Sequence, residues 1–331
     1  MVTAVAVTNK PRPALRLVKT NELSREDWLE VRMTGIGSSD AAAAVGLNPY
    51  KSQLELWMEK TGRGEALPQP DPNDDTSPMY WGTLLEAFVA AHYTKKTERR
   101  VRRVNAVLQH SEHPWMLANL DREVIGADDV QILECKTAGM NGARLWREGV
   151  PEYVQLQVMH QLAVTGKQAA DVAVLVCGND FRVSRIERDE KMIRQLIELE
   201  KQFWNYVETD TPPPADGSDS AARALQALYQ DEGTTIDLSY DLEMANTLHD
   251  LLAVRISLAE AEKLEAQLKQ KIQQRMGEAS KATFGDAAEI TWKKSKDSLV
   301  LDVAKLLSDK PELLKKYPLV KPGSRRFLIS A

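Results

Sequence analysis

Three ionisable residues stand close together near the middle of the chain, in the segment LANLDREVIGADDVQILECKTAG. Asp121 ends one apolar run, a turn follows, and the next run carries Glu134 and Lys136 two residues apart. Residues i and i+2 of a β-strand point to the same face, so Glu134 and Lys136 project together while Cys135 points into the core. Asp121, on the preceding strand of a hairpin, can converge with them.

This group of side chains predicts a metal-dependent chemistry. Two neighbouring carboxylates repel each other unless a cation neutralises them, and hard oxygen ligands of this kind suit Mg²⁺ or Mn²⁺. Lys136 beside them would hold or polarise a water molecule near a scissile phosphate. The same pattern of residues also occurs by chance in many proteins. Other motifs along the chain must therefore show whether it marks a metal site here.

The whole chain has the composition of an ordinary globular protein, with 331 residues, 43% apolar and 27% charged. Its net charge of -5 gives no sign of nucleic acid binding, so any DNA contact must come from local clustering. Two cysteines, Cys135 and Cys177, are too few for a disulfide framework. With no long apolar run and no secretion signal, we expect a protein of the cytoplasm, that of the host cell if a phage encodes it, with no membrane partner.

The elements that must position these residues begin after a small, basic segment, residues 1–20, which we expect to be a flexible arm. The segment SREDWLEVR predicts a helix that Ser24 caps, with Asp27 completing a capping box. A Gly-rich turn, GIGSSD, then leads into a short alanine helix that Gly46 can stop. Residues 62–78 hold several Pro, Gly and Asp residues and predict a long surface loop.

An α/β (α+β) core follows, with a mixed central sheet flanked by helices. The segment MYWGTLLEAFVAAHYTKKT predicts an amphipathic helix with Glu86 beside its apolar face, which holds Trp81, Leu84, Leu85, Phe88 and Val89. Short apolar runs then predict strands, interrupted by the helix PEYVQLQVMHQLAVTG and closed by a helix over residues 187–207.

Residues 211–220, within the stretch TDTPPPADGSDS, predict a Pro-rich linker, because Pro, Gly, Asp and Ser break both helices and strands. The region 221–331 would then hold a helical arm over about 242–278, followed by a small hairpin and one more helix. A series of apolar residues four apart predicts packing between helices or, alternatively, a surface for a partner: Leu264, Leu268, Ile272 and Met276.

Asp121 followed by Glu134-Cys135-Lys136 resembles the PD-(D/E)xK nuclease signature. In addition, GIGSSDAAAAVGLNPYKS, WGTLLE, LECKT, YVQLQVMHQL and IERDEK occur in the order found in the phage lambda exonuclease and YqaJ-type viral recombinase family. The resemblance spans roughly residues 24–210, so we expect a nuclease domain over 21–210. Leu120 departs from the pattern, since many members have proline before the aspartate.

The resemblance implies a role for each matching residue. Asp121 and Glu134 would be metal ligands, together with the backbone carbonyl of Cys135, and Glu86 would bind or orient a second Mg²⁺ ion, with Mn²⁺ as a substitute. Lys136 would assist the attacking water. Gln157 matches an active-site glutamine, with Gln155 as the alternative register. Glu86 could instead be a solvated helix carboxylate, and Gln157 could simply bond to a neighbouring backbone group.

The resemblance also implies a site for a terminal 5′-phosphate, held by Arg32 and Ser39 with Ser38 close enough to share the task. Arginine can bind a phosphate bidentately, and a Gly-flanked turn that opens a helix offers free N–H groups. Ser39 could instead be only an N-cap. A basic cluster either tracks DNA or is a solvated turn: Lys95, Lys96, Arg99, Arg100, Arg102 and Arg103. We expect His160, on the Gln157 helix, to be structural.

For the whole protein the resemblance implies an exonuclease that digests one strand of linear double-stranded DNA from 5′ to 3′. Its partners would be DNA ends and a single-strand annealing protein that uses the 3′ overhang, and its form a homotrimer. Two alternatives stay open. The chain could be an endonuclease or nick-processing nuclease of the same superfamily, or a recombination scaffold that binds DNA ends without cutting.

Overall fold

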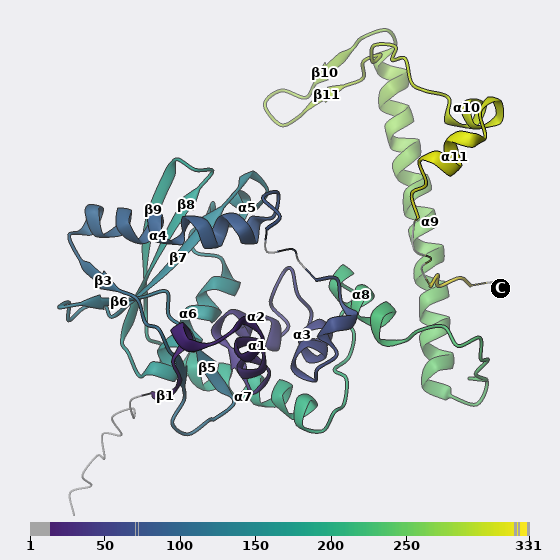
Figure 1. Cartoon of the computed structure of the whole chain (residues 1–331). Helices are drawn as coiled ribbons and strands as arrows, with labels where there is room; N and C mark the ends of the chain where they lie inside the picture. The colour runs from purple at the N-terminus through teal and green to yellow at the C-terminus, as the bar shows by residue number, and fades with distance from the viewer. Residues whose placement is uncertain (1–13, 70, 72, 321–322, 324, 330–331) are drawn as a thin grey trace, which may run out of the picture. The chain divides into compact units, whose positions relative to one another are not determined.

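The computed structural model describes residues 14–69, 71, 73–320, 323 and 325–329. The chain divides into two compact units, residues 1–230 and 231–331 (Figure 1). Every residue to which the sequence assigns chemistry lies in the first unit. None of the helices in the described part of the chain is long and apolar enough to span a membrane.

A five-stranded sheet carries the residues of the LECKT segment. Its strands β6 and β7 are antiparallel neighbours, and β7 runs parallel to β8 because helix α6 (Glu152–Thr165) connects the two. The predicted mixed sheet within an α/β fold is therefore confirmed. The strands in spatial order are β3 (Arg100–Arg102), β6 (Arg122–Ile125), β7 (Ile132–Ala138), β8 (Ala169–Val176) and β9 (Asp180–Glu187).

Helix α4 (Pro78–Thr97) packs on one face of this sheet, against Leu133 and Cys135 of β7 (Figure 1). The predicted buried face is correct at Val89 but is otherwise shifted, because Ala90 and Tyr93 make the contact together with Val89. Tyr93 fixes this orientation, since its hydroxyl donates to the buried Asp171 of β8. Three residues of the predicted face are exposed instead: Trp81 (46%), Leu84 (47%) and Phe88 (65%).

A four-stranded sheet lies in the same unit, in the order β1 (Leu15–Val18), β4 (Val107–Gln109), β5 (Met116–Ala118) and β2 (Ile36–Gly37). The flexible arm predicted for residues 1–20 needs correction, because β1 pairs with β4 as an edge strand. Residues 1–13 lie outside the described residues. Gly35 permits the close approach of β2 to β5, since a Cβ there would stand 2.5 Å from the Trp115 carbonyl oxygen.

The remaining helices of this unit surround the two sheets. Ser24 caps α1 in the predicted capping box with Asp27. The helices are α1 (Arg25–Met33), α2 (Ala41–Ala44), α3 (Gln53–Lys60), α5 (Met140–Ala143), α7 (Glu190–Glu208) and α8 (Asp219–Leu228). Four short 3-10 turns join them: η1 (Thr20–Glu22), η2 (Ser38–Asp40), η3 (Gly64–Ala66) and η4 (Arg144–Trp146).

The predicted linker at residues 211–220 does not mark the division between the units. Beyond the prolines, α8 packs against α3 and buries Ala221 and Ala224. The Ser220 hydroxyl donates to Glu55 and accepts from the backbone N–H of Ser52. The prolines interrupt the helices without separating domains, and the first unit continues to Gln230.

The second unit consists mainly of helix α9 (Leu242–Met276), whose 35 residues match the range that the apolar spacing predicts. A hairpin of β10 (Lys281–Thr283) and β11 (Glu289–Thr291) follows, then two short helices, α10 (Val303–Asp309) and α11 (Glu312–Lys316). Packing between helices at Leu264 and Leu268 is absent within the described residues of this unit, where they are 56% and 55% exposed.

Candidate active site

Asp121 and Glu134 come together where the β6–β7 hairpin meets helix α6. Asp121 stands one residue before β6, and Arg122 pairs with Leu133 in the ladder. An Asp121 carboxylate oxygen, Oδ2, accepts a hydrogen bond of 2.8 Å from the backbone N–H of Cys135. The Glu134 side chain projects from the opposite face of β7 to that of Cys135, which lies in the core under α4, as the alternation of the strand predicts.

Helix α6 holds the Glu134 carboxylate from the other side. Gln157 Nε2 donates to Glu134 Oε1 at 2.6 Å, and Lys136 Nζ lies 2.8 Å from both that oxygen and Gln157 Oε1. Gln161 Nε2 donates to the second oxygen, Oε2, at 2.7 Å. The alternative register is excluded as part of this network, because Gln155 donates to the Val150 carbonyl on the exposed side.

Gln161 is a member of the site that the sequence analysis missed. It follows Gln157 by four residues, so both side chains emerge from the same face of α6. That spacing is visible in the segment QLQVMHQL and could have found it.

Crowding of negative charge dominates the electrostatics. Burial and the neighbouring Glu134 raise the pKa of Asp121 to about 8. Burial opposes the positive charge of Lys136, but Glu134 and Asp121 outweigh it and hold the pKa of this ammonium above its ordinary value. Asp121 and Glu134 therefore repel each other enough to hold a proton on Asp121 near neutral pH, and a cation that takes the place of this proton would relieve the repulsion.

The donor set fits one magnesium ion. Mg²⁺ in proteins is held by one or two carboxylates and keeps several of its waters, and Asp121 and Glu134 supply two. No group of three or more His, Cys, Asp or Glu side chains close enough to hold a metal occurs among the described residues. Glu86 does not complete such a group, because its carboxylate accepts a 2.5 Å hydrogen bond from the Arg122 guanidinium. Arg122 therefore competes with any metal for Glu86.

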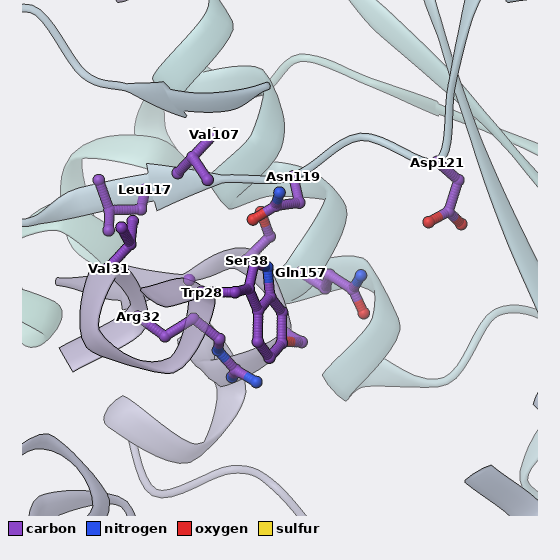
Figure 2. A pocket seen from close by; sticks show the side chains of 11 residues that line it. Trp28, Val31, Arg32, Ser38, Val107, Leu117, Asn119, Asp121 and Gln157 are labelled. Carbon is purple, nitrogen blue, oxygen red and sulfur yellow. The ribbon is translucent and has the colours of Figure 1, made fainter. Parts of the chain in front are cut away.

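A pocket of about 180 Å³ connects this centre to the GIGSSD turn. Figure 2 shows Arg32 and Ser38 on one side and Asp121 on the other, with Gln157 between them. The structure thus brings the predicted phosphate-binding residues to one cavity with Asp121 and Gln157, whereas Glu134, Glu86 and Cys135 are not among its lining residues. The lining residues are Trp28, Val31, Arg32, Gly37, Ser38, Ser39, Val107, Leu117, Asn119, Asp121 and Gln157.

Ser38 has an unsatisfied hydroxyl in this pocket. The residue is 4% exposed, and its Oγ is one of three buried side-chain polar atoms that lack a hydrogen-bond partner among the described residues. A buried polar atom without a partner is costly, so it indicates a place for a ligand atom. Ser39 is exposed and does not cap α2, whose N-cap is Asp40.

Trp28 and Asn119 also line the pocket and were missed in the sequence analysis. The guanidinium carbon of Arg32 lies 5.0 Å from the ring centroid of Trp28, within the range of a cation–π contact. The spacing could have suggested both residues. Trp28 precedes Arg32 by four positions on a helix, and Asn119 precedes Asp121 by two.

Comparison with known proteins places the chain in a family. A family model described as the YqaJ-like viral recombinase domain matches residues 27–168. The protein YqaJ of Bacillus subtilis (strain 168) is 34% identical over 306 residues, which cover 91% of this chain and 92% of that protein. The chain belongs to the YqaJ family. The resemblance seen in the sequence motifs is confirmed.

Other similar proteins match less of the YqaJ-family chain or match it less closely. Protein D345L of African swine fever virus (strain Badajoz 1971 Vero-adapted) is 37% identical over 73 residues, 22% of this chain and 19% of that protein. The alkaline exonuclease LHK-Exo from Laribacter hongkongensis has a TM-score of 0.45 and 22% identity, covering 56% of this chain and 94% of that chain. A phage-related exonuclease from Haemophilus somnus 129PT has a TM-score of 0.35 and 10% identity, covering 55% and 99%.

Two further groups from the sequence analysis have structural partners in this YqaJ-family fold. His160 is fully buried between Glu200 and the Leu117 carbonyl, as expected for a structural histidine. In the basic cluster, Arg99 pairs with Asp129 and Arg102 with Glu123. These pairs reduce the positive charge that the cluster can offer to DNA.

Proposed function

We propose that this chain is a magnesium-dependent exonuclease that hydrolyses one strand of linear double-stranded DNA from 5′ to 3′. The observation that carries the proposal is that one pocket is lined by Arg32 and Ser38 at one end and by Asp121 and Gln157 at the other. The first pair suits a terminal phosphate, and the Asp121–Glu134 centre suits a cation. A DNA 5′ end held in this way has its first phosphodiester bonds near the cation-binding carboxylates.

The side chains divide the work of the reaction. Asp121 and Glu134 would hold Mg²⁺, or Mn²⁺ in its place, with the Cys135 carbonyl as a further ligand. The bound ion would supply Lewis acidity to activate water and to stabilise the leaving 3′-oxygen. Lys136, charged and held 2.8 Å from Glu134, would neutralise charge that develops on the phosphate. Gln157 keeps Lys136 and Glu134 in register, since it bonds to both.

The proposal includes a second ion and partners outside the chain. A second Mg²⁺ ion would require Glu86 to leave Arg122, because the two now form an ion pair. Digestion in this direction leaves a 3′ overhang, the substrate of a single-strand annealing protein, and a homotrimer around the DNA would keep the enzyme on its substrate. Each of these follows from the family resemblance in the sequence.

The test is digestion of linear duplexes labelled at either end, with and without a 5′-phosphate, in Mg²⁺ and in EDTA. We expect nucleotides to be released from the 5′ end in Mg²⁺ alone, and covalently closed circular DNA to stay intact. Cleavage of the circle would instead identify an endonuclease. Binding of DNA ends without cleavage in any divalent metal would identify a scaffold.

Catalytic variants complete the test. Lys136→Ala and Glu134→Ala should each abolish nucleotide release, because they remove the charge-neutralising lysine and a cation ligand. If both variants digest linear duplex as the unaltered protein does, the active centre lies elsewhere.

A further inference from the structure

A buried ion cluster lies directly behind the Arg32 end of the pocket. Arg32 Nη2 donates to both oxygens of Asp40, at 2.7 and 2.9 Å. Lys60 Nζ donates to Asp40 Oδ2 at 2.7 Å and to the backbone carbonyl of Arg32 at 2.8 Å. These three residues, Arg32, Asp40 and Lys60, are called the anion-side cluster below.

The anion-side cluster contains two cations and one carboxylate, and of these only Arg32 reaches solvent, with a side chain that is 29% exposed. The Asp40 and Lys60 side chains are each 3% exposed. Burial favours a neutral Asp40, but Lys60 and Arg32 outweigh it and hold the pKa of this carboxyl well below its usual range, so it is charged. The nearby Lys51 and Glu59 are paired with each other and add no net charge. One positive charge therefore remains in excess, and Arg32, which reaches solvent, can present it to an anion in the pocket.

Arg32 is the only member of the cluster that lines the pocket. Its Nη2 is committed to Asp40, while its Nη1 and Nε have no hydrogen-bond partner among the described residues. The Trp28 ring contacts the same guanidinium. Asp40 thus fixes the plane of the guanidinium and leaves its other donors free for an incoming oxyanion.

We propose that Asp40 and Lys60 are positioning residues for Arg32, and that the preference for a 5′-phosphate end, which the family resemblance implies for this pocket, depends on them. Asp40 orients the arginine. Lys60 neutralises Asp40, so that the full charge of Arg32 remains available to the phosphate. This inference rests on the proposed function, since it concerns the same pocket.

The chain offers a matched control at Asp171. This aspartate is as buried as Asp40, at 3% against 2% exposed, and is likewise held by an arginine and a second donor, Arg185 and Tyr93. It does not line the pocket. If Asp40 serves only stability, Asp40→Asn and Asp171→Asn should behave alike.

The experiment measures kcat and KM on linear duplexes of one sequence with either a 5′-phosphate or a 5′-hydroxyl, for the full chain and for Asp40→Asn, Lys60→Met and Asp171→Asn. We expect the first two variants to reduce the preference for phosphate by about tenfold, mainly through KM, as for the loss of one charge-assisted hydrogen bond. Asp40→Asn should do so although it adds net positive charge, because the guanidinium of Arg32 loses the partner that orients it. Cleavage of hydroxyl ends should change little. Asp171→Asn should keep the full preference.

Binding of the same duplexes in EDTA, followed by fluorescence anisotropy, separates the two proposals. If the unaltered chain cleaves neither end, the proposed function fails, and the binding preference alone decides the inference. The inference is overturned if the unaltered chain has no preference, or if both variants keep it or lower both ends by the same factor. Should Asp40→Asn fail to fold, Lys60→Met decides, because it leaves the Arg32–Asp40 pair intact.

Discussion

Two kinds of charge cluster occur in the first unit, and they differ in how completely their charges are neutralised. Beside β8 and β9, Asp171 and Asp129 face Arg185 and Arg99, two carboxylates against two guanidinium groups. We call this the balanced cluster. At the pocket, charge is left over at both ends. The anion-side cluster has an extra cation, whereas Asp121 and Glu134, when both are ionised, have only Lys136 between them.

The difference separates charges that hold the fold from charges that await a ligand. In a balanced cluster each charge has a partner of opposite sign, so the cluster needs no further ligand. A cluster with one charge in excess is less stable unless an ion of opposite sign binds to it. The two ends of the pocket have excess charges of opposite sign, which suits an anionic phosphate at one end and a cation at the other.

The largest effect should come from the negative end. Asp121→Asn keeps the shape of the side chain but removes one of the two carboxylates. We expect Mg²⁺-dependent cleavage of linear duplex to fall by about 10³-fold, in the range seen when a group acting on the transition state is lost. Single-turnover cleavage at saturating Mg²⁺ measures it, together with Mn²⁺ binding by calorimetry.

The control for this change is Asp171→Asn, which removes a buried carboxylate from the balanced cluster. It should leave cleavage and Mn²⁺ binding nearly unchanged. Equal losses in the two variants would mean that the charge imbalance at Asp121 has no functional meaning.

The second effect concerns the positive end. Arg32→Met keeps the length of the side chain and its contact with Trp28 but removes the guanidinium. We expect cleavage of 5′-phosphorylated ends to fall by about 10- to 100-fold, because charge-assisted hydrogen bonds contribute roughly 1.5–3 kcal/mol each. Cleavage of 5′-hydroxyl ends should change far less. A uniform loss on both kinds of end would show that Arg32 supports the fold rather than the phosphate.

A smaller effect should follow from the helix that holds Glu134. Gln161→Leu removes the donor to Glu134 Oε2 and leaves Gln157 in place. Residues that orient a metal ligand typically affect metal affinity or activity by 10- to 100-fold, and we expect about tenfold here. The Mg²⁺ concentration for half-maximal cleavage should rise. Gln155→Leu, on the exposed side of the same helix, is the control, and an equal effect there would contradict the assignment.

Much of this site could be predicted from local sequence patterns. The alternation of a strand is sufficient to put Glu134 and Lys136 on one face and Cys135 on the other. The capping box at Ser24 and the full length of α9 were likewise visible, because each depends on residues within a few positions of one another.

What the sequence could not supply depends on contacts between distant segments. The buried face of α4 is set by the bond from Tyr93 to Asp171, 78 positions away. Glu86 pairs with Arg122, which no local pattern indicates. The packing of α8 on α3 likewise joins Ser220 to Ser52, so a Pro-rich stretch that only connects α7 to α8 looked like a domain boundary.

A change in the balanced cluster should have the smallest effect on activity, and it tests the comparison most strictly. Asp171→Asn breaks the buried pair with Arg185 and weakens the bond from Tyr93, so the free energy of unfolding should fall by about 3 kcal/mol. Urea denaturation measures that loss. At temperatures where the variant stays folded, its kcat on either kind of DNA end should lie within about twofold of the unaltered chain, as for other changes remote from a site.

A large loss of activity in folded Asp171→Asn would contradict the distinction between the balanced cluster and the charges at the pocket. The reason is geometric: α4 packs through Tyr93 onto Asp171 and carries Glu86 two turns earlier on the same face, so a shift of the helix could reach Arg122 and then Asp121. The variant Asp129→Asn tests whether such a loss comes from movement of α4. It neutralises an exposed member of the same cluster without touching Tyr93, so it should leave α4 in place. If Asp129→Asn also lost activity, the balance of charges would no longer distinguish the balanced cluster from the two charged groups at the pocket.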